Sequence, residues 1–272
     1  MAADLASLLA DLEAESSDLE VRIVRLEPSQ WLQPTPAAGW TIADHVAHLA
    51  YFDDAARLAV TEPDRFRVRA GLLAARGDDF SDRIAALYRG AEARALLQWF
   101  RSARRDLVST YGGCDPRRRV PWYGPDMSVA SSITARIMET WAHGQDVADT
   151  LAQAREPTSR LRHVAHIGVG ALAFSFAVNG RPVPERPVRI ELVGPDGDIW
   201  TWGSATATDS VVGGALDFCL VVTQRRNLAD TALVVTGAVA REWLSIAQAF
   251  AGPPGPGRPP GRAAVNDGGA VE

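Results

Sequence analysis

The sequence predicts an all-α N-terminal part, expected to fold as a bundle of helices, followed by a small C-terminal α+β part. Three observations predict this class. Long segments up to about residue 178 carry apolar residues at helical spacing. After "NGRPVPERP" the pattern changes to short alternating runs separated by turn residues. The last segment is rich in proline and glycine. We expect a helical bundle over 1–179, an α+β domain over 180–250 and a disordered tail over 251–272.

The first two helices follow from spacing and capping. Residues 3–27 favour a helix with an apolar stripe, and "WLQPTPAAGW" ends it with two prolines and a glycine. Thr41 can then cap a new helix with its hydroxyl, and Asp44 lies three residues later in the positively polarised first turn. We expect this helix to extend to about Val60. The stripe of the first helix consists of Leu5, Leu8, Leu9 and Leu12.

Three further helical segments complete the bundle. One long helix is expected over 81–110, a loop "YGGCDPRRRVPWYGPDMS" follows, and another helix begins near Ser128. A last helical run covers about 160–178. The inner side of the 81–110 helix should carry Leu87, Leu96, Leu97, Phe100 and Leu107.

The C-terminal part has the pattern of a small α+β domain. "VRIELVG" alternates apolar and polar residues, "PDGD" is a turn and "IWTWGS" is a second short strand, so 188–203 predicts a hairpin. Helical runs at about 211–226 and 237–249 flank a short apolar stretch at "ALVVTG".

Composition limits the partners. The 272 residues are 47% hydrophobic and 22% charged, which is enough for a sizeable core. The net charge of −5 gives no general attraction to nucleic acid or to anionic membranes. Arg117, Arg118 and Arg119 form the one basic run, and we interpret it as a solvated face. With no long apolar run and an acidic N-terminus, we expect a cytoplasmic protein without a membrane or nucleic-acid partner.

Two residue types narrow the chemistry. All 28 basic residues are arginine, so a lysine of a phosphate-binding loop, a Schiff base and a lysine general base are excluded. Cys114 and Cys219 are far apart and have no metal-finger spacing, so we expect two free thiols.

The strongest candidate site lies in "METWAHGQDVAD" and "DHVAHLA". Glu139 and His143 are four residues apart, so their side chains share one face of a helix. His45 and His48 share a face of the earlier helix. One of these two histidines together with the Glu-His pair would provide three ligands from two helices. Imidazole and carboxylate suit zinc or a neighbouring divalent metal, and three ligands leave positions open for chemistry.

Simpler interpretations stay open at this stage. Each pair alone is compatible with a solvated pair or with structural histidines, as expected also for His163 and His166. We favour His48 over His45 because it lies deeper in the apolar stretch. Asp146 lies on the face of His143, where it can accept the other ring N–H or be a solvated helix acid.

"GWTIADHVAHLA" and "RIMETWAHGQDVAD" together resemble the DinB/YfiT-like metal-binding superfamily, in particular its mycothiol-dependent maleylpyruvate isomerase branch. The resemblance covers about residues 1–250, and the loop "RRRVPWYGPDMS" resembles one actinobacterial subgroup. It implies a DinB-like four-helix bundle, a sterol-carrier-like α+β domain and one divalent metal, usually zinc. The implied ligands are His48, Glu139 and His143.

The resemblance also implies a role for an arginine near the end of a C-terminal helix. "VVTQRR" matches that region and places the role on Arg225, with Arg226 as the competitor. The family pattern usually has a glycine where this chain has Gln224.

The implied activity uses a low-molecular-weight thiol such as mycothiol. A metal lowers the pKa of a bound thiol, and the thiolate can add to an electrophilic double bond for isomerisation or S-transfer. Arg225 would hold a substrate carboxylate or stabilise an enolate. Three aromatic residues would line the pocket for the small-molecule substrate, although they also fit a core: Trp122, Tyr123 and Trp141.

Two other function classes remain. A metal with bound water would give a thiol-independent hydrolase or lyase, with Asp146 or His45 as the base. Alternatively, the protein binds an apolar metabolite without catalysis. Either a monomer or a homodimer is compatible with the sequence.

Overall fold

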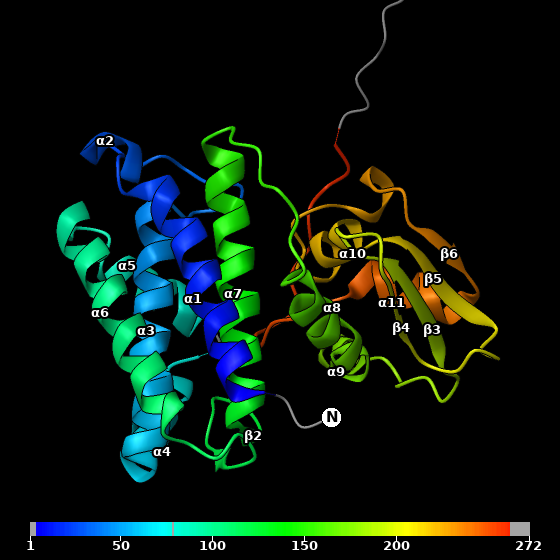
Figure 1. Cartoon of the computed structure of the whole chain (residues 1–272), viewed down its shortest axis with the longest axis horizontal. Helices are drawn as coiled ribbons and strands as arrows, with labels where there is room; N and C mark the ends of the chain where they lie inside the picture. Colours follow the sequence, from blue (N-terminus) through cyan, green and yellow to red (C-terminus); the bar gives the residue numbers. More distant parts are fainter. Residues whose placement is uncertain (1–3, 78, 262–272) are drawn as a thin grey trace, which may run out of the picture. The chain divides into compact units, whose positions relative to one another are not determined.

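The structure, a computed structural model, describes residues 4–77 and 79–261 and divides the chain into two compact units (Figure 1). Of the described residues, unit 1 comprises 4–77, 79–167 and 250–253, and unit 2 comprises 168–249 and 254–261. A helix-rich first part and a smaller, sheet-containing second part agree with the predicted class. The domain boundary expected after residue 179 lies inside unit 2.

Unit 1 is built on α1 (Leu5–Ile23), α3 (Ile42–Thr61), α6 (Ala93–Gly112) and α7 (Val129–Thr150). Helix α3 packs against α6, α1 packs against α7, and both pairs contact each other. Apolar faces meet between these helices and form the core of the unit. Shorter elements surround them: α2 (Pro28–Trp31), α4 (Pro63–Ala74), α5 (Phe80–Leu87), β1 (Arg119–Val120) and β2 (Met127–Ser128).

Two predicted helix starts are confirmed. Thr41 caps α3 in a capping box with Asp44, whose carboxylate accepts a hydrogen bond from the Thr41 backbone N–H at 2.8 Å. Arg89 pairs with the same buried carboxylate at 3.1 Å, which fixes the first turn of α3. Ser128 caps α7 through its side chain. These contacts set where α3 and α7 begin.

The expected single helix over 81–110 is wrong, because the chain forms α5 and α6 with a break at residues 88–92. The break contains Gly90, whose backbone entropy disfavours a helix interior. Leu87 is therefore at the end of α5, where it is 74% exposed, while the apolar residues of α6 point inward as expected. Helix α4 was not predicted.

A buried ion network joins the long helices of unit 1. The Asp53 carboxylate on α3 accepts hydrogen bonds from Arg104 Nε at 2.7 Å and Nη2 at 3.2 Å. Arg104 Nη2 also donates to Thr140 on α7 at 3.0 Å, and Nη1 donates to Ser16 on α1. Arg136 Nε lies 3.3 Å from Asp53. Since these charges are buried, removing one partner would leave another uncompensated.

Unit 2 contains a four-stranded sheet in the order β4-β3-β5-β6. The predicted hairpin is confirmed, with β3 (Val188–Val193) antiparallel to β4 (Ile199–Trp202). Strand β5 (Asp209–Gly214) pairs parallel with β3, and β6 (Val234–Thr236) pairs antiparallel with β5. The other elements are α9 (Leu172–Val178), α10 (Ala215–Val222), the short 3₁₀ turn Leu228–Asp230 and α11 (Ala238–Ile246).

Two helix predictions in the C-terminal half are corrected. The expected helix over 211–226 starts only at Ala215, because Val211 is buried and Val212 exposed in the alternation of strand β5. The run over 160–178 forms two helices, α8 (Leu161–Gly170) and α9, bent by 52°. None of the single helices described has the length and apolarity needed to cross a membrane, and α8 with α9 meets that test only as a bent pair.

The described part of the tail lacks regular secondary structure but is hydrogen-bonded to unit 2. Asn227 donates to the Arg258 carbonyl at 2.8 Å, and the Gly261 N–H donates to Asp230 at 2.7 Å. Residues 262–272 of the expected disordered tail lie outside the described residues. Cys114 and Cys219 are both free thiols, as expected.

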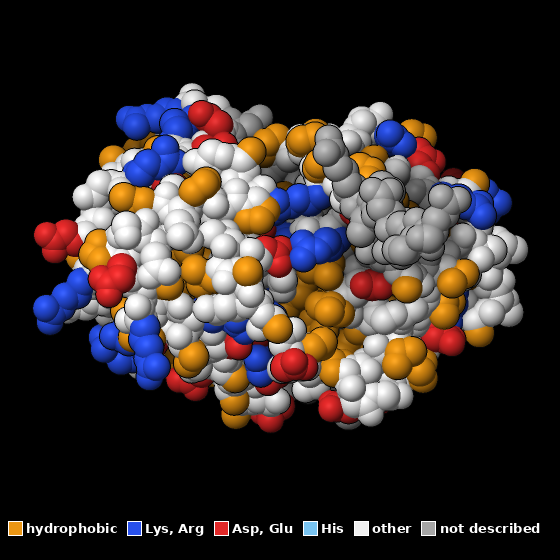
Figure 2. All heavy atoms as spheres, turned by 90° about the horizontal axis from the view of Figure 1, so that it is seen from above, with side chains coloured by type: hydrophobic (Ala, Val, Ile, Leu, Met, Phe, Trp, Pro, Cys, Tyr) orange, Lys and Arg blue, Asp and Glu red, His pale blue; other side chains and the backbone are white. Residues whose placement is uncertain are grey.

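Charges of both signs are interspersed on the face that Figure 2 shows. Within the basic run, Arg118 donates to the Val60 carbonyl at 2.8 Å and Arg119 donates to the Asp126 carbonyl. These arginines therefore help to hold the loop before α7.

Candidate metal centre

Three predicted ligand residues converge in unit 1, from α3 and α7. Glu139 Oε2 lies 3.2 Å from His143 Nε2 and 3.5 Å from His48 Nε2. The ligand atoms of all three residues lie within 4.8 Å of one another. The arrangement follows from helix geometry, because Glu139 and His143 are one turn apart on α7 and face α3.

The spacing and the donor types fit a divalent ion. A tetrahedral zinc with bonds of about 2.1 Å keeps its ligand atoms about 3.4 Å apart. The two measured separations, 3.2 and 3.5 Å, lie on either side of that value. Two imidazoles and one carboxylate suit zinc and leave a coordination position open. The Glu139 side chain is 21% exposed, so the site opens toward solvent.

The protonation states also suit metal binding. Burial lowers the pKa of His48 to about 4, with a smaller contribution from the nearby His143. For Glu139, burial alone would raise the pKa, but the interactions with the imidazoles of His143 and His48 outweigh it and hold the pKa well below its ordinary value. At neutral pH both His48 and Glu139 therefore have free electron pairs to donate.

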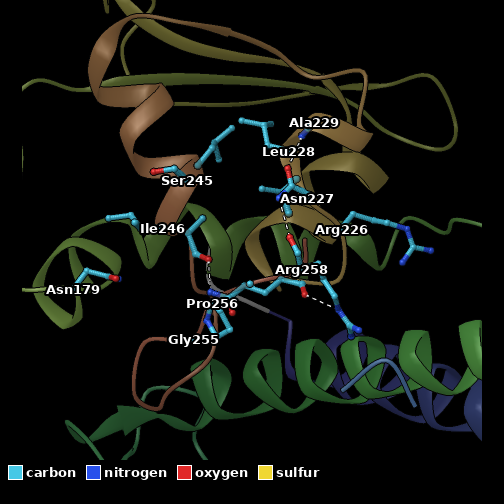
Figure 3. A pocket seen from close by; sticks show the side chains of 15 residues that line it. Asn179, Arg226, Asn227, Leu228, Ala229, Ser245, Ile246, Gly255, Pro256 and Arg258 are labelled. Carbon is cyan, nitrogen blue, oxygen red and sulfur yellow. Dashed lines mark hydrogen bonds between the residues drawn. The ribbon is translucent and has the colours of Figure 1, made fainter. Parts of the chain in front are cut away.

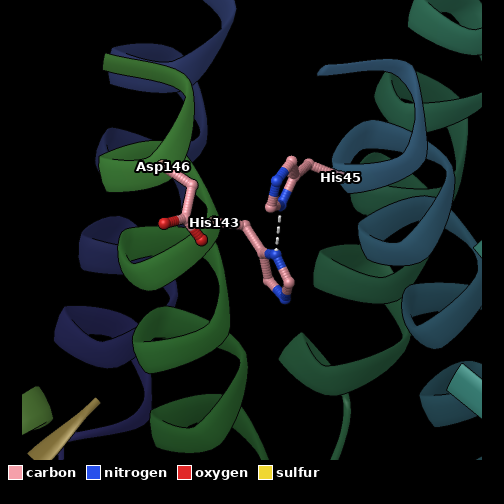
Figure 4. A group of neighbouring side chains, drawn as sticks. All are labelled: His45, His143 and Asp146. Atoms are coloured by element: carbon pink, nitrogen blue, oxygen red, sulfur yellow. Dashed lines mark hydrogen bonds between the residues drawn. The ribbon is translucent and has the colours of Figure 1, made fainter. Parts of the chain in front are cut away.

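A second group, His45 with His143 and Asp146, also has its ligand atoms within 4.8 Å (Figure 4). Its two Nδ1 atoms are only 2.6 Å apart. This separation is shorter than the roughly 3.4 Å between ligands of one ion and is that of a strong hydrogen bond. His45 and His143 therefore share a proton, and the first group is the better metal site.

Hydrogen bonds around His45 assign its tautomer. The Thr35 hydroxyl donates to the Trp40 carbonyl at 3.1 Å, so its oxygen accepts from His45 Nε2 at 2.8 Å. His45 Nδ1 then has a free electron pair and accepts the proton of His143 Nδ1. This leaves His143 Nε2 unprotonated and facing Glu139. The chain from Thr35 thus orients a candidate ligand, as outer partners do in metal sites.

His45 and His48 therefore have different roles in the geometry. The burial argument used to choose between them does not hold, because His45 is fully buried and His48 is 8% exposed. The choice follows from direction, since His48 faces Glu139 while His45 contacts Thr35 and His143. Asp146 is fully buried and belongs to the group around His45.

Trp40 covers the histidine cluster, a feature that sequence reasoning missed. Its ring stacks on His143 with centroids 5.6 Å apart at 16°, and it lies 5.3 Å from the ring of His48. The indole N–H donates to Asp82 on α5 at 2.8 Å. Gly39, at φ +78°, permits the turn that precedes Trp40. A tryptophan directly before the helix cap in "GWTIADH" was the available signal.

An aromatic cluster borders the site on the side of His48. The Phe52 ring lies 4.5 Å from His48, 5.5 Å from Tyr123 and 6.2 Å from Trp122. Phe66 stacks on Trp122 at 5.7 Å. Burial raises the pKa of Tyr123, which keeps its phenol neutral. Trp122 and Tyr123 are thus connected to the candidate ligands through Phe52.

Trp141 has different surroundings. The Arg155 guanidinium lies 5.4 Å from its ring centroid, and Arg155 Nη1 donates to the Trp141 carbonyl at 2.7 Å. No contact between Trp141 and the histidine rings was found among the described residues. Its role in lining the site stays a prediction.

Arg225 and Arg226 belong to unit 2, directly after α10. Arg225 Nη1 donates to the Thr223 carbonyl at 2.7 Å, and Arg226 Nη1 donates to the Arg225 carbonyl at 2.8 Å. Gln224, where a glycine was expected, has φ +60°, which is the left-handed region that glycine favours. Its side chain donates to the Ala247 carbonyl at 3.1 Å. The catalytic role of either arginine stays a prediction.

Unit 2 also contains a cavity of about 450 Å³, which the sequence did not predict (Figure 3). Apolar side chains such as Leu228, Leu244 and Ile246 line it together with Asn227 and two arginines. The tail passes along its rim at residues 255–258. The two arginines are Arg226 and Arg258.

The fold and the site define a helix-rich protein with a candidate metal centre of two histidines and one glutamate. Residues 10–148 match the family described as the mycothiol maleylpyruvate isomerase N-terminal domain, and this match covers just over half of the chain. The chain therefore belongs to that family, which confirms the resemblance read from the two motifs.

Relatives and solved structures agree with this placement. Two uncharacterised proteins of Mycobacterium tuberculosis, from strains CDC 1551 and H37Rv, are each 44% identical over 94% of this chain and all of their own length. A crystal structure of the mycothiol-dependent maleylpyruvate isomerase is similar with a TM-score of 0.57 at 14% identity. A histidine-to-alanine mutant of that enzyme gives 0.59 at 15%. Both matches cover 82% of this chain and 90% of the other, and they show a shared fold.

Proposed function

We propose that the protein is a metal-dependent enzyme that uses a low-molecular-weight thiol to isomerise a small electrophilic substrate, or that transfers the whole thiol to such a substrate through its sulfur. The convergence of His48, Glu139 and His143, at separations that suit one tetrahedral ion, carries this proposal. Family membership supports this proposal, because the family is described as the N-terminal domain of mycothiol maleylpyruvate isomerase. The finer architecture belongs to the same proposal: a DinB-like four-helix bundle with a sterol-carrier-like α+β domain.

Zinc is the proposed ion, because two imidazoles and a carboxylate are typical zinc ligands. When bound, it would lower the pKa of a thiol at the open position and so supply a thiolate nucleophile at neutral pH. Mycothiol is the proposed thiol because of the family.

The chain's own residues position these groups. Thr35 and His45 hold His143 with its Nε2 unprotonated, and Trp40 covers the histidine rings. Asp146, buried within the His45 group, is proposed to help orient that pair. The aromatic side chains beside His48 would exclude water from the reacting atoms.

Substrate binding completes the proposal. Arg225, with Arg226 as the alternative, would hold a substrate carboxylate through a bidentate pair. Trp122 and Tyr123 would form an apolar wall for a small unsaturated skeleton, reached from His48 through Phe52.

Dependence of turnover on thiol tests this function. Zinc-reconstituted protein is mixed with maleylpyruvate, with and without mycothiol, and isomerisation is followed by absorbance. We expect turnover only with the thiol, and its loss in His143→Ala. The matched control is His163→Ala, which removes a histidine of unit 1 that pairs with Asp11 instead. Isomerisation without thiol would contradict the proposal, and release of hydrolysis or elimination products without thiol would favour a metal-dependent hydrolase or lyase.

The cavity of unit 2 supports a second candidate function, the binding of an apolar metabolite without catalysis. Leu228, Leu244 and Ile246 give its mixed polar and apolar lining an apolar part, and its volume of about 450 Å³ is in the range of small-molecule sites. Binding of a fluorescent fatty acid that is lost in Leu244→Arg, with metal content unchanged, would favour this candidate.

A further inference from the structure

Arg136 is a buried arginine of α7 that begins the second motif, and the sequence gives it no role. It is only 3% exposed and lies one turn before Glu139, on the same face of the helix. Its Nε is 3.3 Å from Asp53, but its Nη2 is buried without a hydrogen-bond partner among the described residues. A buried guanidinium with an unused donor is costly and requires an explanation.

The ion network does not satisfy Arg136. The Asp53 carboxylate already accepts two hydrogen bonds from Arg104, whose other donors reach Ser16 and Thr140. Two guanidinium groups thus share one carboxylate, and Arg104 has the better contacts. One positive charge is left over on the side of Arg136.

This charge lies next to the candidate metal centre. The guanidinium carbon of Arg136 is 6.0 Å from the centroid of the Phe52 ring, and that ring is 4.5 Å from His48. His48 Nδ1 is likewise buried without a partner. The Phe52 ring therefore neighbours both His48 and Arg136, each of which has a buried nitrogen without a partner.

We propose that Arg136 recognises the carboxylate of the substrate at this centre, with Nη2 donating to a carboxylate oxygen. The positive charges of Arg136 and Arg104 balance the negative charges of Asp53 and Glu139. A bound divalent ion would therefore give the site a net positive charge, which favours the binding of an anionic substrate. The neighbouring aromatic rings of Phe52, Trp122 and Tyr123 suit contact with a flat, unsaturated carbon skeleton. The centre would then select small unsaturated carboxylates through a residue of its own unit, independently of Arg225.

This inference deepens the proposed function and rests on it for the reaction, but carboxylate binding can be tested without turnover. Maleate is the probe, and maleamide, with the same skeleton and no charge, is the matched control ligand. Each is titrated calorimetrically into wild type, Arg136→Lys and Arg136→Gln, with zinc and after its removal. Zinc content and circular dichroism are recorded for every protein.

We expect maleate to bind the wild type more tightly than maleamide, also without zinc. Loss of a charge-assisted hydrogen bond should weaken maleate binding by about 10- to 100-fold in Arg136→Gln and less in Arg136→Lys, with maleamide binding unchanged. The lysine variant retains a charge beside Asp53, so it decides the question if the glutamine variant does not fold. Equal affinity of the wild type for both probes, or unchanged maleate affinity in a folded variant, would overturn the inference. Failure of the metal site would be visible separately, as missing zinc in the wild type.

Discussion

Acid should destabilise the metal-free protein through His48. In the unfolded chain this imidazole has its ordinary pKa of 6.5, whereas burial lowers the pKa to about 4 in the folded protein. Below pH 6.5 the unfolded state therefore binds a proton that the folded state does not, and stability falls as the pH falls. Each pH unit costs about 1.4 kcal/mol, so the loss is about 2 kcal/mol at pH 5.0 and about 3 kcal/mol near pH 4.

The assay is urea unfolding, in the presence of a chelator, of wild type and His48→Gln at pH 7.5, 6.0 and 5.0. The glutamine variant lacks the titrating group, so the wild type should lose about 2 kcal/mol more than the variant between pH 7.5 and 5.0. The low pKa of Glu139 also makes the folded protein less stable as the pH falls. This loss begins only below about pH 4.5, the pKa of the unfolded carboxyl, so it lies outside the pH range of the assay. Parallel stability curves for the two proteins would refute the reasoning.

Three further predictions concern other contacts. Thr35→Val should lower zinc affinity by about 10- to 100-fold without unfolding the protein, because it removes the hydrogen-bond acceptor for His45 Nε2. Competition with a chelator measures this affinity, and an unchanged value would contradict the tautomer assigned to His45. In urea unfolding, Gln224→Gly should be about 1 kcal/mol more stable than Gln224→Ala. Both variants lose the side-chain hydrogen bond to the Ala247 carbonyl, but only alanine is strained at φ +60°, so equal stability of the two would refute this prediction. Gly168→Ala should lower stability by about 1–3 kcal/mol, because its Cβ would lie 2.6 Å from Val222, whereas Gly170→Ala meets no atom within 4 Å and should not destabilise.

Local signals gave the helix starts and the ligand spacing. The capping box at Thr41 and the cap at Ser128 are encoded within four residues, and both are present in the structure. The four-residue spacing of Glu139 and His143 likewise fixes their common face whatever surrounds the helix. Motifs of this kind depend on the chain nearby and can be predicted from it.

Contacts between distant segments could not be predicted in this way. The helix expected over 211–226 includes the last four residues of strand β5, because the hydrogen bonds of this strand come from β3, about 20 residues earlier, and a local pattern does not report them. The break before α6 was missed because the apolar spacing on both sides resembled one helix. In each case tertiary packing overrode a local preference.

In the candidate site too, local spacing could be predicted from the sequence, whereas contacts between helices could not. Spacing indicated His45 and His48 equally, and only the direction of each ring in the fold separates them. Arg136 lies in the second motif, but its unused donor becomes visible only in the fold, where Arg104 occupies the Asp53 carboxylate. Trp40 lay inside a quoted motif, but its stacking on His143 depends on α7.

Elemental analysis of the purified protein shows whether His48, Glu139 and His143 bind a metal ion. Wild type, His48→Ala, Glu139→Ala, His143→Ala and the control His45→Ala are reconstituted with zinc, dialysed and checked for folding by circular dichroism. We expect about one zinc per chain in the wild type. The three ligand variants should lose the ion while folded, and His45→Ala should retain it with weaker affinity. A wild type without zinc after reconstitution, or a folded Glu139→Ala that keeps a full equivalent, would contradict a metal centre formed by these three residues.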